Sequence, residues 1–149
     1  AAELKAEHSG SIYARFAAML EARRAVDSGD LKGAEAALRW ALTAGDTRSD
    51  IGQLIQLRLA RVLADQGKET EALAILGQGS AAFPVAYAQA KGDIHLAAGR
   101  PEQALAAYRQ GRDLATELGQ HSVVLDNKVR TLETRLPVDA SPEIAEGAI

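Results

Sequence analysis

The chain has 149 residues, a formal net charge of −3 and no cysteine, and its length suits one domain. The charges are interspersed without a basic stripe, which excludes a protein that holds nucleic acid through phosphate contacts. The lack of cysteine excludes disulfides, thiolate catalysis and Cys-ligated zinc.

The composition favours helices throughout. The chain is rich in alanine, leucine, glutamate and arginine, and aromatic residues make up only 4% of it. Apolar residues recur at intervals of three and four, and no stretch alternates with a period of two. The sequence therefore predicts an all-α fold.

A turn glycine followed five residues later by an alanine occurs three times. The pairs are Gly29/Ala34, Gly67/Ala72 and Gly99/Ala104, and successive glycines lie 38 and 32 residues apart. These intervals bracket the ~34-residue period of tetratricopeptide repeats. Glycine tolerates the positive φ at the end of a helix, and alanine lets two helix axes cross closely. The repeat predicts an α-solenoid of three tetratricopeptide-like helix hairpins.

We expect a single repeat domain over residues 1–136. In chain order, its elements are a helical stub at about 1–7, hairpins at about 11–44, 49–78 and 84–117, and a capping helix at about 121–136. A stretch longer than one repeat allows, around residues 41–53, predicts an extended loop between the first and second hairpins.

The capping helix is expected to cover the last hairpin. Its apolar residues are Val123, Val124, Val129, Leu132 and Leu136, and Asp126, Lys128, Arg130 and Glu133 would form its outer polar face. Residues 137–149 contain two prolines, small residues and acids, so they predict a flexible tail.

No pattern for catalysis, a metal or a cofactor stands out. His8, His95 and His121 have no partner at the spacing of a helical metal site. The run Gly77 to Ser80 has neither the preceding strand nor the following Lys-Ser/Thr of a phosphate-binding loop, so we interpret it as a flexible inter-repeat loop. We therefore predict that the chain is not an enzyme.

The first helix of each hairpin is expected to line an inner groove that binds protein. Counting back from the turn glycines places twelve residues there: Phe16, Met19, Arg23, Val26, Asp27, Leu54, Leu57, Arg61, Asp65, Gln89, Asp93 and Leu96. Two units repeat an arginine four residues before an aspartate, Arg23/Asp27 and Arg61/Asp65. Either these are exposed ion pairs of small energy, or they recognise an extended or helical peptide.

The segments LIQLRLARVLADQGKETEALAIL and AKGDIHLAAGRPEQALAAYRQG, within a likeness from about Ser11 to Leu136, resemble the YfgM family. That resemblance implies a tetratricopeptide-like subunit of the bacterial Sec translocon, held in the periplasm by one N-terminal transmembrane helix. It also implies SecYEG and a PpiD-like chaperone, or unfolded client chains, as partners. The anchor is not in this sequence, so the resemblance implies an excised domain from the periplasmic side of the inner membrane.

Two other functions stay open. One is an adaptor of the outer-membrane lipoprotein type for pilus or barrel assembly, which requires an upstream signal peptide ending at a cysteine. The other is a regulatory domain of an enzyme complex whose chemistry resides in a partner chain.

Overall fold

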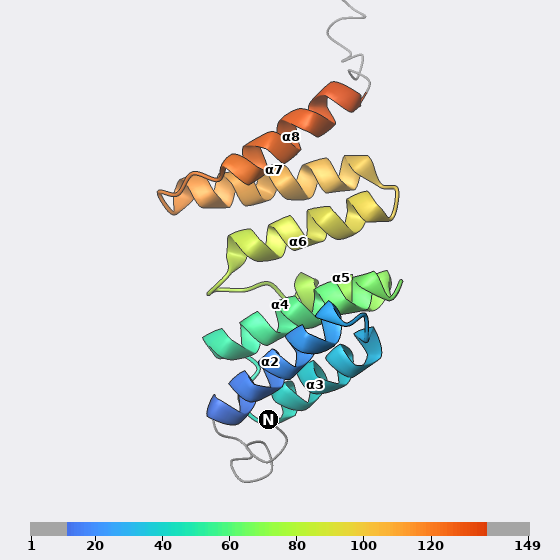
Figure 1. Ribbon diagram of the computed structural model, residues 1–149. Helices are drawn as coiled ribbons and strands as arrows, with labels where there is room; N and C mark the ends of the chain where they lie inside the picture. The colour runs from blue at the N-terminus through green and yellow to red at the C-terminus, as the bar shows by residue number, and fades with distance from the viewer. Residues whose placement is uncertain (1–11, 137–149) are drawn as a thin grey trace, which may run out of the picture.

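The computed structural model describes residues 12–136, which form seven α-helices and no strand. The helices are α2 (Ile12–Asp27), α3 (Leu31–Thr43), α4 (Asp50–Asp65), α5 (Glu69–Gly77), α6 (Pro84–Ala97), α7 (Pro101–Glu117) and α8 (Val123–Arg135). They stack in chain order, from α2 and α3 at one end to α8 at the other (Figure 1). The predicted all-α solenoid of three hairpins with a capping helix is confirmed.

Each hairpin turns at its predicted glycine. Gly29, Gly67 and Gly99 have φ values of 81°, 80° and 75°, a region that side chains disfavour. The Gly29 amide donates to the Val26 carbonyl at 3.0 Å, and the next amide, of Asp30, donates to the Ala25 carbonyl at 2.7 Å. The same pair of bonds recurs at the other two turns, so each helix ends with its last carbonyls satisfied.

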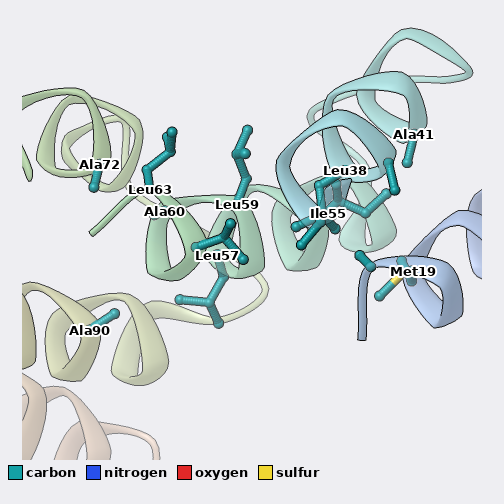
Figure 2. Close-up of a cluster of buried hydrophobic side chains, with 14 of the residues drawn as sticks. Met19, Leu38, Ala41, Ile55, Leu57, Leu59, Ala60, Leu63, Ala72 and Ala90 are labelled. Carbon is teal, nitrogen blue, oxygen red and sulfur yellow. The ribbon is translucent and has the colours of Figure 1, made fainter. Parts of the chain in front are cut away.

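Small residues allow the helices of a hairpin to meet closely. Ala34, Ala72 and Ala104 are all 0% exposed, which confirms their predicted place at the helix crossings. A large apolar cluster runs from α2 to α6 and includes Met19, Leu38, Leu57 and Ala90 (Figure 2). A smaller cluster around Tyr108 joins α7 to α8.

Charged side chains tie successive hairpins together. Glu35 on α3 accepts hydrogen bonds from Lys68 Nζ at 2.9 Å, Gln66 Nε2 at 2.7 Å and Arg39 Nε at 2.8 Å. These hydrogen bonds, that from Lys68 foremost, hold the pKa of Glu35 at about 2, below its ordinary value of 4.5. One repeat later, Arg100 Nη1 lies 3.0 Å from Glu69 Oε1. Lys68 and Arg100 each follow a turn glycine, so the turn of one hairpin binds the second helix of the hairpin before it.

The loop between the first and second hairpins is organised around Arg15, a buried residue that the sequence did not single out. Arg15 is 5% exposed, and its guanidinium donates to the Ala41 carbonyl at 3.0 Å and the Asp46 carbonyl at 3.2 Å. It also donates to Ser49 Oγ at 3.4 Å, and that oxygen caps α4 by accepting from the Gly52 amide at 3.1 Å. Burial lowers the pKa of Arg15, against the opposing effect of Asp46. The predicted longer loop is therefore fixed to α2.

The loop after α5 is also fixed, contrary to the prediction of a flexible segment from Gly77 to Ser80. Gln53 Oε1 on α4 accepts from the Ser80 hydroxyl at 2.6 Å and from the Ala82 amide at 3.0 Å. The backbone carbonyl of Gln53 accepts from the Tyr87 hydroxyl at 2.6 Å. One glutamine thus links α4 to the loop and to the start of α6.

The capping helix packs through part of the predicted stripe: Val129 and Leu132 are buried and Leu136 packs against the same cluster. Its buried residues are Leu125, Val129 and Leu132, whose spacing defines a single helix face. Val123 and Val124 lie off this face and are 61% and 52% exposed. Lys128 does not belong to an outer polar face, because its Nζ lies 2.9 Å from Asp93 Oδ1 on α6.

The predicted helical stub at 1–7 and the tail at 137–149 lie outside the described residues and stay predictions. Among the helices between residues 12 and 136, none has both the length and the apolar character that a membrane crossing needs.

Candidate functional site

Two cavities lie side by side along the first helices of the hairpins. The first, of about 380 Å³, lies mainly between α2 and α4 and is lined by Met19, Ala22, Arg23, Val26, Leu38, Arg58, Arg61, Val62 and Asp65. The second, of about 350 Å³, lies mainly between α4 and α6 and is lined by Arg61, Ala64, Asp65, Gly67, Glu69, Ala90, Asp93, Ile94, Ala97 and Ala98. Arg61 and Asp65 line both cavities. We call the surface formed by the lining residues of the two cavities the groove face.

The first cavity has an apolar floor that reaches into the core. Met19, Leu38 and Val62 are buried members of the main apolar cluster, and Val26 adds an exposed apolar edge. The floor therefore offers contacts to an aliphatic or aromatic side chain. Methionine suits such a floor because its flexible thioether adapts to different shapes.

The charged residues at this cavity form no ion pairs with each other. The pairs Arg23/Asp27 and Arg61/Asp65 are not formed, and Arg61 Nη1 instead lies 3.9 Å from Asp93 Oδ2 on the next hairpin. Within residues 12–136, neither Arg23 nor Arg58 has a carboxylate at ion-pair distance. The structure thus excludes the simpler interpretation of the repeated Arg and Asp as ion pairs within one helix.

Two of the three carboxylates at the second cavity, Glu69 and Asp93, have partners inside the domain. Asp93 Oδ1 accepts from the Tyr108 hydroxyl at 2.6 Å and from Lys128 Nζ at 2.9 Å. The Lys128 ammonium also lies 5.2 Å from the centre of the Tyr108 ring. Burial, with the bond to Asp93, raises the pKa of the Tyr108 hydroxyl. With Glu69 bound to Arg100, these groups hold hairpins two and three and the capping helix together.

Half of the twelve predicted groove residues line the two cavities. Met19, Arg23, Val26, Arg61, Asp65 and Asp93 do so, whereas Phe16, Asp27, Leu54, Leu57, Gln89 and Leu96 do not. Leu57 is a correction: it is 7% exposed and packs into the main cluster with α6 (Figure 2).

The remaining misplacements come from extending one helix register over three hairpins. On α6 the lining residues are Ala90, Asp93, Ile94 and Ala97, so the lining face is rotated away from Gln89 and Leu96. Leu54 packs against the main cluster. Phe16 and Asp27 are exposed on α2 without lining either cavity.

Sequence reasoning missed Arg58, the third arginine at the first cavity. Its signal was present, because Arg58 precedes Arg61 by three residues and so shares its helix face. Leu38 was missed for a different reason: it comes from α3, and the prediction considered only the first helix of each hairpin.

The two histidines among the described residues occupy structural or surface positions. His95 Nδ1 accepts from Arg100 Nε at 3.1 Å, and burial, followed by the Arg100 charge, lowers the pKa of His95. His121 is exposed and lies 3.1 Å from Asp126, while His8 lies outside the described residues. In the part of the chain that the structure describes, no group of three or more candidate ligands is placed to hold a metal ion.

Stacked helix hairpins, a positive-φ glycine at each hairpin turn and a groove along the first helices define an α-helical repeat protein. A sequence profile described as a tetratricopeptide repeat-like domain matches residues 1–134. The chain belongs to that family. Comparisons with curated proteins and with solved structures gave no significant match. Repeat domains of this class generally mediate protein–protein interactions through the surfaces that their stacking creates.

Proposed function

We propose that the chain is a non-catalytic scaffold that binds a polypeptide segment along the groove face. One observation carries the proposal: the first cavity combines an apolar floor with arginines that have no carboxylate partner within the described residues. An apolar floor with a few fixed polar groups at its edge is typical of sites for peptides and small molecules. A groove that runs along two or three helices suits an extended or helical segment.

We further propose that this scaffold works on the periplasmic side of the inner membrane, next to the SecYEG translocon and a PpiD-like chaperone. The support is the resemblance of the second and third hairpins to the YfgM family, together with the tetratricopeptide-like fold. The proposal requires a transmembrane anchor N-terminal to residue 1.

The binding role is tested by photo-crosslinking from the groove face. A photoreactive residue replaces Val26 at the first cavity, and a matched variant carries it at Ala74, an exposed residue on α5 that lines neither cavity. Both variants are expressed in the source cells and irradiated. We expect protein adducts from position 26 and few from position 74. Adducts from position 74 alone, or from neither position, would contradict the groove as the binding surface.

The location is tested separately. The gene upstream of residue 1 should encode a basic stretch followed by about twenty apolar residues, and translocon or chaperone subunits should be among the adducts. Absence of the upstream apolar segment would contradict the proposal of a membrane-anchored scaffold. It would not affect the proposed binding role.

A further inference from the structure

We infer that the first cavity selects a partner segment in which an aliphatic side chain is flanked by carboxylates. This inference rests on the proposed binding role and specifies the chemistry of the bound segment. It follows from the size and floor of the cavity, from the sign of the charges around it, and from the lack of carboxylate partners for two of those charges among residues 12–136.

The cavity has the size of a side-chain pocket. Its volume of about 380 Å³ lies near the lower end of the range of about 300–1,000 Å³ for ligand sites. A dry apolar cavity of about 150 Å³ already accepts a benzene ring, so one aliphatic side chain fits with room for its backbone. The buried side chains of Met19, Leu38 and Val62 form the contact surface for it.

The charges favour an acidic segment. Arg23 on α2 faces Arg58 and Arg61 on α4 across the cavity, and Asp65 is the one carboxylate among the lining residues. In a chain with a net charge of −3, this rim is a local exception. Arginine binds carboxylates through two parallel hydrogen bonds, and such bonds strengthen where an apolar surface excludes water.

The second cavity does not share this chemistry. Its carboxylates at Glu69 and Asp93 are already bound to Arg100, Tyr108 and Lys128. A segment that bound there would have to compete with these internal bonds. Selection by charge is therefore expected at the first cavity. There, a bound segment would not have to displace any carboxylate of the described residues from Arg23 or Arg58.

Three labelled peptides of one length test the inference by fluorescence anisotropy on the full chain. The acidic probe carries a central Leu with Glu on both sides, the neutral probe has Gln in place of each Glu, and the third probe has Ser in place of Leu. We expect the acidic probe to bind about tenfold or more tightly than either of the others. Its affinity should fall as salt is added, because exposed charges are screened. Equal affinities for the three probes would overturn the inference.

A double variant assigns the effect to the cavity. Arg23→Gln with Arg58→Gln should weaken binding of the acidic probe about tenfold and leave the neutral probe unchanged. The control variant is Arg24→Gln with Arg130→Gln, which removes the same charge at exposed residues that line neither cavity. An equal loss in both double variants would show a general charge effect and overturn the inference. Unchanged thermal unfolding of both variants confirms that the fold is intact.

Two other occupants are outcomes of the same experiment. The run Glu143-Ile144-Ala145-Glu146 of this chain has the inferred chemistry, so Glu143→Gln with Glu146→Gln would raise probe affinity if the chain's own tail filled the cavity. Dimerisation that depends on Arg23 and Arg58, measured by sedimentation, would make a second copy the occupant. Either result would overturn the inference that the cavity binds a segment of a separate partner. Crosslinking from position 26 without discrimination among the probes would overturn only the selectivity and leave the proposed function intact.

Discussion

Gly92 on α6 is a position at which one added methyl group should strongly destabilise the fold. A Cβ added there would lie 2.3 Å from Cε1 and 2.4 Å from Cδ1 of Tyr108. The ring is 0% exposed, and its hydroxyl is bonded to Asp93 at 2.6 Å. The ring is therefore held at its far end and cannot move aside without breaking the Asp93 bond.

The expected size of the effect combines three contributions. Overpacking costs about 1–3 kcal/mol, and loss of a hydrogen bond to a charged group costs about 1.5–3 kcal/mol. Replacing glycine by alanine within a helix gains about 1 kcal/mol. Gly92→Ala should therefore lower the free energy of unfolding by about 1.5–5 kcal/mol.

Urea denaturation followed by circular dichroism measures this change, and Gly77→Ala is the matched control. Gly77 is exposed at the end of α5, and a Cβ there would meet no heavy atom within 4 Å. The control should be neutral or gain up to about 1 kcal/mol. If Gly92→Ala is as stable as the unmodified chain, the close packing of α6 on α7 around Tyr108 is wrong.

Three further predictions concern stability. Ala104→Leu should cost about 1–3 kcal/mol by overpacking a buried helix crossing, whereas Ala106→Leu on the exposed side of α7 should be nearly neutral; equal melting temperatures would count against the hairpin assignment. Arg15→Ala should cost about 2–4 kcal/mol because it removes the charged donor that fixes the Ala44–Ser49 loop, and a loss no greater than that of exposed Arg24→Ala in thermal unfolding would refute this role. Because the pKa of Glu35 is lowered to about 2 from 4.5, its stabilising contribution is complete above about pH 4.5 and is lost as the pH falls toward 2. Glu35→Gln should flatten the dependence of unfolding free energy on pH across that window, and an unchanged profile would contradict the bonds to Glu35.

The sequence predicted the features that depend on local backbone chemistry. A turn that needs a positive φ selects glycine, so Gly29, Gly67 and Gly99 located the hairpins. The requirement for a small residue at a helix crossing selected Ala34, Ala72 and Ala104. Features set by contacts between hairpins were not predictable in this way.

Arg15 illustrates the limit. A charged residue on a helix ordinarily faces solvent, and its burial here depends on the Ala41 carbonyl of α3 and the Asp46 carbonyl of the loop that follows, both distant in sequence. Lys128 on the capping helix was assigned to an outer surface for the same reason, yet it binds Asp93 of the third hairpin.

The sequence predicted a groove along the first helices of the hairpins, but it did not place every lining residue correctly. Arg23 and Arg61 occupy the same position relative to their turn glycines, so counting back from each glycine placed both of them at the cavity. Leu57 was misplaced because the packing of α6 on α4, which buries it, is not determined by the periodicity of α4 alone.

The most direct test of the account is to map the bound surface by NMR. The domain carries labelled methyl groups, and a peptide corresponding to the crosslinked partner segment is added. The methyl signals of Met19, Val26 and Val62 at the first cavity should shift, while those of Val123 and Val124 on the capping helix should not. Shifts at Val123 and Val124 without shifts at the cavity would contradict the groove face as the binding surface.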